Sequence, residues 1–480
     1  MGRTDPASDR ATGPATGPEI DLLIGPATGA KTGAPTGRES SVPSGRWARL
    51  ARMGTLATGL AGGMLAEGAR QWSQGQRPSA RDLLLTPGNA KRVAGQLAQL
   101  RGAAMKVGQL LSMDAGELLP PALGEILATL RSDARPMLIG QVDDVLTAGW
   151  GSGWDERFSQ FSFTPLAAAS IGQVHRATAK DGRDLAIKIQ YPGIRQSIDS
   201  DVDNVGTLLR ISGLLPRSMD LAPLLLQAKA QLHEEADYLR EADCLRQYAG
   251  LLADRPEYLL PAVYTDWTTE NILTMGYVGG AAIESLSSAP QTERDRIVSL
   301  LMELLFRELF EFHLIQTDPN FANYQLERAT GRIILLDFGA TRAYPRATVD
   351  AYRQLMRGAL RSDRHAIGEA AQSIGYFGDA IHAHQREAVV ALFDTACEPL
   401  REAGAYDFAN SNLAARIRDA GMALSMEHGH WHTPPADALF LHRKLGGLYL
   451  LATRLQARVP VQRLALPFLG DPNGSAPLHF

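Results

Sequence analysis

Two stretches decide the fold expected of this chain: Phe312-His-Leu-Ile-Gln-Thr-Asp-Pro-Asn-Phe-Ala-Asn-Tyr324 and Ile333-Ile-Leu-Leu-Asp-Phe-Gly-Ala340. In the first, Asp318 precedes Asn323 by five residues. The second carries Asp337 of an Asp-Phe-Gly triplet at the end of an apolar strand, 19 residues after Asp318. One carboxylate can orient or deprotonate an acceptor, while an amide oxygen and a second carboxylate hold Mg²⁺ between two phosphates. Either motif is common alone, but their order and spacing together predict kinase-type phosphoryl transfer.

The bulk composition sets the class of protein. The 480 residues are 45% hydrophobic and 21% charged, which suits two or three folded domains. A formal net charge of −4 argues against nucleic-acid binding. Two cysteines, Cys244 and Cys397, exclude a disulfide scaffold and fit a reducing compartment. No apolar run has the length of a membrane span, and the start lacks a signal-peptide pattern. The expected protein is soluble or peripheral, and cytoplasmic.

Shifts in composition divide the chain into four regions. Residues 1–45, with recurring Thr-Gly pairs, are predicted to be a disordered tail. The next three regions are a helical extension over 46–150, a β-rich lobe with one helix over 151–280 and a helical lobe over 281–480. Helices of the last region are expected near residues 295–313, 346–373, 382–402 and 437–456.

A run of small apolar residues extends from Met53 to Ala66, directly after Arg46, Arg49 and Arg52. At 14 residues, it is too short to cross a bilayer straight. Two interpretations stay open. The run either lies in a membrane interface beside its basic residues, or forms a helix packed on its own protein.

The stretch from Leu166 to Ala177 can be laid over the protein-kinase glycine loop, G-x-G-x-x-G-x-V. Ala167 and Ala169 then stand where the first two glycines would, while Gly172 and Val174 match. A Cβ restricts positive φ and keeps the backbone farther from phosphate, so these alanines predict altered nucleotide binding. The predicted nucleotide-binding residues of the loop are Ala167, Ala168, Ala169, Ser170, Gly172 and Val174.

Lys188 follows Val174 by 14 residues, which fits a strand–turn–strand hairpin. The lysine is expected to contact the α- and β-phosphates. It needs a carboxylate partner, and the helical stretch from Gln231 to Asp243 offers several. Glu235 and Glu241 are six residues apart and therefore on different faces of one predicted helix, so that one of them can pair with Lys188.

Lys106 and Gln109 are three residues apart in a helical pattern over 88–113, so they share one helix face. On their own they are most simply a solvated surface pair.

Taken together, six motifs resemble the UbiB/AarF-type atypical kinases, a protein-kinase-like family that supports coenzyme Q biosynthesis. The resemblance covers about residues 46 to 458. Its motifs are K-x-G-Q (Lys106 to Gln109), A-A-A-S-I-G-Q-V-H (Ala167 to His175), I-K-I-Q-Y-P-G (Ile187 to Gly193), E-x-D-Y-x-x-E (Glu235 to Glu241), L-L-D-F-G-A-T-R (Leu335 to Arg342) and L-H-R-K-L-G-G (Leu441 to Gly447).

The resemblance implies an α+β, protein-kinase-like bilobal fold, with a small β-rich N-lobe, a larger helical C-lobe and a helical extension over the active site. It implies ATP and Mg²⁺ as cofactors. Lys188 and Asp318 would be catalytic residues, Asn323 and Asp337 would hold the magnesium ion, and Glu241 would be the partner of Lys188.

The resemblance also implies a gate. Lys106 and Gln109 would lie on the helical extension and face Glu235 and Asp237. The extension would then block the groove in which a protein kinase holds a peptide.

Two departures from bacterial relatives are expected to matter. Those relatives carry H-x-D-x-H-P-G-N in the catalytic loop, whereas this chain has Gln316-Thr-Asp-Pro-Asn-Phe-Ala-Asn323, which looks more like the mitochondrial coenzyme Q branch. Bacterial members often have hydrophobic C-terminal spans, but Arg454, Arg458 and Pro460 interrupt the end of this chain. Any membrane contact would therefore use the N-terminal small-residue run and basic surfaces.

Two further patterns concern substrate and metal. After Asp337 the chain enters a helical pattern by about Pro345, with no long activation segment and no A-P-E. A docking platform for a protein substrate is therefore expected to be missing. The histidines from His428 to His432, with His382 and His384 upstream, are interpreted as a polar loop and not as a zinc site.

The favoured interpretation is a Mg²⁺-dependent ATPase or small-molecule kinase that supports ubiquinone biosynthesis at a membrane surface. Its expected partners are ATP, a quinone-precursor lipid or phenolic small molecule, an anionic membrane surface and quinone-biosynthesis enzymes, with no nucleic acid. It would be peripheral at the inner face of a membrane. The alternative is a non-catalytic, nucleotide-gated scaffold or switch that binds lipid or biosynthetic partners. Conventional protein kinase activity is disfavoured.

Overall fold

Five antiparallel strands form the sheet of the small lobe, with the order β1-β3-β4-β6 and β2 paired to β3. The computed structural model describes Leu97 and residues 100–114, 136–212, 221–378, 381–426 and 435–470. The predicted tail, the small-residue run and the histidines at 428–432 lie outside the described residues. The strands are β1 (Phe158–Phe161), β2 (Ala167–Ala168), β3 (Gly172–Ala179), β4 (Asp184–Gln190) and β6 (Ile272–Gly276).

Strands β3 and β4 form the hairpin expected from the sequence. Leu185, Ile187 and Ile189 alternate with polar or small residues and are fully buried on one face of the sheet. The turn contains Gly182 at φ 88°, a left-handed conformation that glycine adopts without strain. Val174 pairs directly with Lys188 across the hairpin, and such pairs point to the same face of the sheet. The lysine therefore lies beside the alanine-rich loop.

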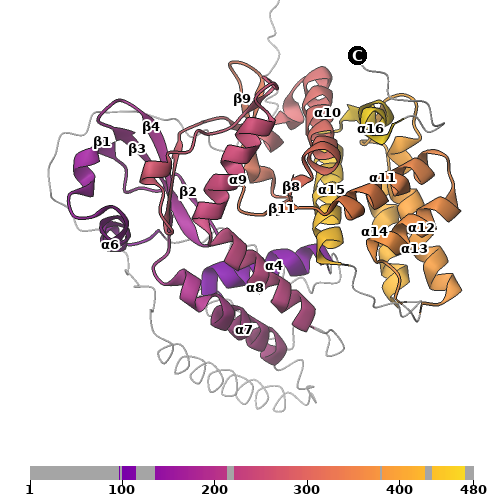
Figure 1. The fold of residues 1–480 in the computed structure, drawn as a ribbon, viewed down its shortest axis with the longest axis horizontal. Coiled ribbons are helices and arrows are strands. Elements are labelled where there is room, and N and C mark those ends of the chain that lie inside the picture. Colours follow the sequence, from indigo (N-terminus) through magenta and orange to yellow (C-terminus); the bar gives the residue numbers. More distant parts are fainter. Residues whose placement is uncertain are drawn as a thin grey trace, which may run out of the picture. The chain divides into compact units, whose positions relative to one another are not determined.

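Helices cover both faces of this sheet (Figure 1). Helix α6 (Ile139–Trp150) buries Val142 and Leu146 in a core with the apolar β4 side chains. The other core joins the sheet to four helices. They are α4 (Arg101–Asp114), α7 (Ile194–Ser212), α8 (Ala222–Glu235) and α9 (Tyr238–Leu251).

The prediction of one helix in the small lobe was wrong, because α7, α8 and α9 all lie between β4 and β6. The signal for α7 was present in the sequence. Ile198, Val202, Val205 and Leu209 recur at helical spacing, and all four are buried.

The rest of the chain, where the structure describes it, is mostly helical and has three small sheets. Strand β10 pairs in parallel with β5, and antiparallel β9 and then β7 complete that sheet. Two short pairs are β11–β8 and β12–β13. The strands are β5 (Tyr258–Leu259), β7 (Ala281–Ala282), β8 (Leu314–Gln316), β9 (Tyr324–Glu327), β10 (Arg332–Leu335), β11 (Thr341–Ala343), β12 (Tyr406–Asp407) and β13 (Arg458–Val459).

The helices of this larger lobe enclose one continuous hydrophobic core. Helix α10 continues through a π-helical turn over Glu308–Phe312 into β8. Among the described residues, no helix has both the length and the apolar character that crossing a bilayer requires. The helices are α10 (Gln291–Arg307), α11 (Arg346–Leu360), α12 (Arg364–Ile374), α13 (Ala383–Ala396), α14 (Leu413–Met426), α15 (Ala436–Arg454) and α16 (Val461–Leu469).

A buried histidine of α15 is expected to make the stability of the fold depend on pH. His442 packs among the rings of Tyr352, Tyr376 and Phe393, and the Tyr376 hydroxyl lies 2.8 Å from its Nδ1. Burial lowers the pKa of His442 to about 4. The unfolded chain binds a proton near pH 6.5, whereas the folded chain does not, so acid favours unfolding. We expect the free energy of unfolding to fall by about 2 kcal/mol between pH 7 and pH 5 through this group.

Urea titrations at the two pH values would measure that change. His442→Gln should lose the His442 component of the slope, whereas His365→Gln, at an exposed position on α12, should retain it. Equal slopes in all three proteins would show that His442 does not resist protonation.

Candidate active site

Lys188 lies at the centre of an ion-pair cluster in which Glu241 is buried and the side chain of Asp337 is 37% exposed. Its Nζ donates to both carboxylate oxygens of Glu241 at 2.8 and 2.9 Å, and it lies 3.5 Å from Oδ2 of Asp337. The three side chains come from β4, from the first turn of α9 and from the second residue after β10. The two carboxylates raise the pKa of Lys188 well above its ordinary value, against the opposing effect of burial, so the lysine is a stable cation.

Asp318 and Asn323 lie on the loop between β8 and β9. The Asn323 amide donates to Oδ2 of Asp318 at 2.9 Å, and Leu336 N donates to Asn323 O at 2.9 Å. The loop is thereby joined to the segment that carries Asp337. Burial raises the pKa of Asp318, with the charges of Asp337 and Glu235 acting in the same direction and Lys106 against them. A carboxylate whose pKa is raised is better suited to accept a proton.

Asp337 is held in an uncommon backbone conformation. Its φ of 54° is a left-handed conformation that few residues other than glycine adopt, which fixes the direction of its side chain. Oδ1 accepts a hydrogen bond from Gly339 N at 3.1 Å. Although partial desolvation opposes them, Lys188 and this backbone donor lower the pKa of Asp337, so the side chain is an anion.

The donor set fits Mg²⁺. Because the Asn323 nitrogen is directed to Asp318, its side-chain oxygen is the atom left for a cation, and Asp337 supplies a carboxylate. Mg²⁺ prefers such oxygen ligands and takes its other positions from phosphates and water. In the part of the chain that the structure describes, no group of three or more His, Cys, Asp or Glu side chains is arranged to hold a metal alone.

The alanine-rich loop is the tight hairpin between β2 and β3. Ala169 N donates to Gly172 O at 2.8 Å, and Ala167 pairs with Val174, so these four predicted residues and Ala168 lie on paired backbone. A Cβ at Gly172 would come within 2.3 Å of Ile189 O. The glycine therefore permits β3 to approach β4, and its role here is close packing.

Glu235 joins this hairpin to helix α4. It accepts a hydrogen bond from Ser170 Oγ at 2.5 Å and pairs with Lys106, which is 5% exposed. A Cβ at Gly102 of α4 would come within 2.5 Å of Ser170 O, so the helix lies directly against the hairpin tip. The side chain of Gln109 lies outside the described residues.

The predicted single helix through Glu235 and Glu241 is wrong. Helix α8 ends at Glu235 and α9 begins at Tyr238, with Asp237 between them. The Asp237 side chain accepts a hydrogen bond from Arg240 N at 3.0 Å and thus caps α9. The break turns one carboxylate toward Lys106 and the other toward Lys188.

The segment after Asp337 is short and firmly held. Strand β11 pairs with β8, and α11 begins at Arg346. No long activation segment therefore lies between Asp337 and α11. Arg240 donates to the carbonyl oxygens of Gly339 and Thr341. Arg342 donates to both carboxylate oxygens of Glu234 at 2.6 and 2.7 Å. These arginines connect the segment to the two helices that supply the carboxylates.

Reasoning from the sequence missed three residues beside the site. Gln316 ends β8, where the loop with Asp318 begins, and Lys444 of α15 donates to its side-chain oxygen at 3.0 Å. Arg240 is the third. The sequence contained a signal for Lys444, since it belongs to the motif from Leu441 to Gly447, but no local pattern related it to the loop.

The fold and the site define a protein-kinase-like protein with a bilobal α+β architecture, as the sequence predicted. A model of the ABC1 atypical kinase-like domain matches residues 129–371, about half of the chain. The chain belongs to this family, which confirms the resemblance to UbiB-type atypical kinases and to their mitochondrial branch.

Relatives and a solved structure agree with this assignment. The chain is 38% identical to the mitochondrial atypical kinase coq-8 of Caenorhabditis elegans, over 88% of this chain and 57% of that protein. It is 36% identical to the atypical kinase COQ8 of Saccharomyces cerevisiae, over 89% and 85%, and 36% identical to COQ8B of Rattus norvegicus, over 89% and 81%. The structure of Rv3197 from Mycobacterium tuberculosis, in complex with erythromycin, has a TM-score of 0.53 and 25% identity, covering 77% of this chain and 92% of its own.

Proposed function

We propose that the protein is a Mg²⁺-dependent ATPase or atypical kinase. The observation that carries the proposal is the position of Lys188, which contacts Glu241 and lies 3.5 Å from Asp337. Kinase-type sites need this lysine and carboxylate held in place before phosphoryl transfer begins. Family membership supports the same class of activity.

Each residue would have one role in the reaction. Lys188 would bind the α- and β-phosphates, and Asp318 would orient or deprotonate the attacking group. Asn323 and Asp337 would hold the magnesium ion. When bound, the ion would neutralise charge that develops between the β- and γ-phosphates.

We further propose that the activity supports ubiquinone biosynthesis at a membrane surface. The yeast and rat relatives are named as mitochondrial atypical kinases COQ8 and COQ8B. A quinone-precursor lipid or phenolic small molecule would be the acceptor or client, and an anionic membrane surface and biosynthetic enzymes would be partners. The protein would act peripherally. The short segment between Asp337 and Arg346 disfavours a protein substrate.

A nucleotide-gated switch is the second candidate. Glu235 contacts Ser170 of the hairpin and Lys106 of α4 at the same time. A nucleotide that moves the hairpin would disturb this joint contact and could release α4. Such a protein would bind nucleotide without turnover.

Mg²⁺-dependent ADP release separates these candidates. The wild-type protein would be assayed with and without anionic-lipid vesicles that carry a phenolic quinone-precursor mimic. Turnover that rises with the vesicles supports the membrane-coupled ATPase. Nucleotide binding without ADP release under all conditions would favour the switch.

The Ala169→Gly variant tests whether the alanines tune nucleotide binding. Ala169 holds the tight turn through its bond to Gly172 O, and loss of its Cβ would give the backbone access to more conformations. We expect the dissociation constant for Mg-ATP or Mg-ADP to change roughly 2- to 5-fold. Calorimetric titration would measure it, with Ala405→Gly in an exposed loop as control. Identical affinities would remove this role for the alanines.

A further inference from the structure

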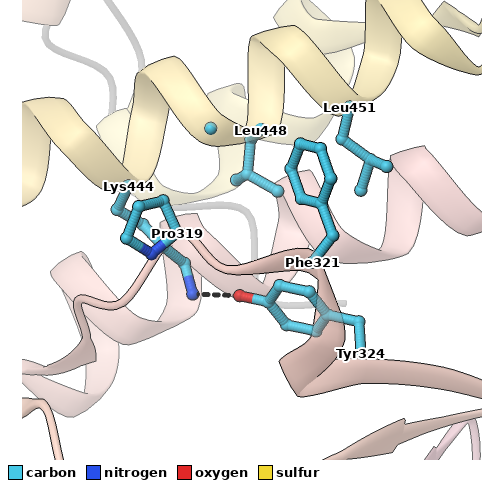
Figure 2. Close-up of a pocket in the computed structure, with 7 residues that line it drawn as sticks. Pro319, Phe321, Tyr324, Lys444, Leu448 and Leu451 are labelled. Atoms are coloured by element: carbon cyan, nitrogen blue, oxygen red, sulfur yellow. Dashed lines mark hydrogen bonds between the residues drawn. The ribbon is translucent and has the colours of Figure 1, made fainter. Parts of the chain in front are cut away.

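Lys444 is a buried cation beneath the catalytic loop. The residue is 3% exposed and projects from α15, far along the chain from the loop. Its Nζ donates to Gln316 Oε1 at 3.0 Å and to the hydroxyl of Tyr324, the second of which Figure 2 shows. Both acceptors are buried as well. The ammonium group therefore reaches both ends of the catalytic loop.

Gln316 extends this contact to the second half of the site. Its Nε2 donates to the main-chain oxygen of Asp337 at 3.2 Å, while its Oε1 accepts from Lys444. Gln316 precedes Asp318 by two residues, and Tyr324 directly follows Asn323. Lys444 thus contacts the residues that flank Asp318 and Asn323. Through Gln316 it is also linked to the backbone of Asp337.

Helix α15 also touches the loop through close packing. A Cβ at Gly447 would come within 2.6 Å of Pro319 Cβ, so only glycine permits this approach. Around the contact, Phe321 and Leu448 line a narrow gap that has no room for a water molecule (Figure 2). Gly447 lies three residues after Lys444 and so shares its helix face.

The hydrogen bonds of Lys444 indicate positioning more than ion pairing. The carboxyl group that pairs with it is that of Glu308, whose Oε2 lies 3.8 Å away and has no hydrogen-bond partner. The ammonium donates instead to two neutral groups of the loop. A buried ion pair is weak evidence of stabilisation, because apolar residues often replace one without loss. The direction of the donors is therefore the informative feature.

We propose that Lys444 is a positioning residue, which holds Gln316 and Tyr324 so that Asp318, Asn323 and Asp337 keep their relative places. The inference rests on the proposed function for its kinetic consequences, but the held geometry itself can be tested without turnover. It also accounts for glutamine at position 316, since a carboxamide accepts from Lys444 and donates to Asp337 O at once.

The test begins with Lys444→Met and with the double variant Lys444→Met/Glu308→Gln. The single variant leaves Glu308 buried without its cation, so it is expected to lower the thermal midpoint by several degrees. The double variant removes both charges and should recover most of that loss. In both, we expect kcat to fall about 100-fold while KM for ATP changes little, as for a misplaced catalytic group. Lys180→Met, at an exposed residue, should change neither the thermal midpoint nor kcat.

Hydrogen exchange gives a readout independent of activity. The amides of Thr317 and Leu336 join the loop to the Asp337 segment through Ala340 O and Asn323 O. Both should exchange faster in the stable double variant. Gln316→Leu should reproduce the kinetic defect. Combining it with Lys444→Met should lower kcat little further, because both changes remove the same hydrogen bond between Lys444 and Gln316.

The outcomes separate this inference from the proposed function. If wild-type protein releases no ADP, the proposed function fails and exchange rates alone decide: faster exchange supports positioning, and unchanged exchange overturns it. If wild-type protein turns over, a stable double variant with normal kcat would overturn the inference. If Lys444→Met lowers kcat but its effect and that of Gln316→Leu are fully additive in the combined variant, the linkage through Gln316 would be overturned.

Discussion

Asp318→Asn is expected to reduce Mg²⁺-dependent ADP release roughly 10²- to 10⁴-fold, the usual contribution of a positioned acid or base. The variant keeps nearly the same shape and retains a side-chain oxygen that can accept from Asn323 Nδ2. The metal-binding pair Asn323 and Asp337 should therefore stay in place. We expect the dissociation constant for Mg-ATP to change little, which separates loss of chemistry from loss of binding.

The pH dependence of turnover gives a second readout on Asp318. Because burial raises its pKa, the group gains a proton at a higher pH than an ordinary carboxyl. Turnover of the wild-type protein should fall as the pH drops through that raised value, since the protonated form cannot act as a base. The residual turnover of Asp318→Asn should lack this limb of the profile.

Asp203→Asn is the matched control for this variant. Asp203 lies on α7, its side chain is 60% exposed, and it pairs with Lys229 away from the site. The control should retain wild-type turnover and pH profile. Near-normal ADP release by Asp318→Asn would exclude Asp318 as the catalytic base and would favour the nucleotide switch.

The sequence predicted the parts of the site that are fixed by short-range spacing. The separation of 14 positions from Val174 to Lys188 matches a hairpin in which the two residues pair directly. The interval from Asp337 to Arg346 is too short for an activation segment, and the structure fills it with β11 and a loop. In both cases the chain length between two residues leaves few possible conformations.

Helix boundaries were harder to predict, because apolar residues recur at helical spacing on both sides of the breaks. A helix expected over 346–373 is two helices, interrupted where Ser362 adopts φ 54° and Asp363 accepts from Ala366 N to cap α12. Asp237 caps α9 in the same manner. Each aspartate is a recognisable N-cap signal, but an uninterrupted pattern of apolar residues concealed it.

Most contacts between distant residues could not be predicted from local sequence patterns. Lys444 and Gln316 are 128 residues apart, and nothing near either one specifies the other. Lys106 and Glu235 are 129 apart, and only the family resemblance suggested that they meet. Such pairs depend on how helices pack, which is set by the whole core and not by any local pattern.

Lys188→Met is expected both to destabilise the fold and to abolish nucleotide binding. The change leaves Glu241, only 2% exposed, without the cation that contacts both its oxygens. Breaking one side of such a buried pair costs about 3–5 kcal/mol. Burial already raises the pKa of Glu241 to about 7, so its protonation should relieve part of this cost in acid. The loss should therefore be smaller at pH 6 than at pH 8.

The double variant Lys188→Met/Glu241→Gln separates the two effects. With both charges removed, most of the unfolding free energy should return, yet nucleotide binding should stay absent because the phosphate contact is gone. Lys229→Met, which breaks the more exposed pair with Asp203, should cost at most about 1 kcal/mol and leave binding unchanged. Denaturant titration and calorimetry with Mg-ATP would measure both quantities. Wild-type affinity in a stable double variant would show that Lys188 is a structural residue and would remove the observation on which the proposed function rests.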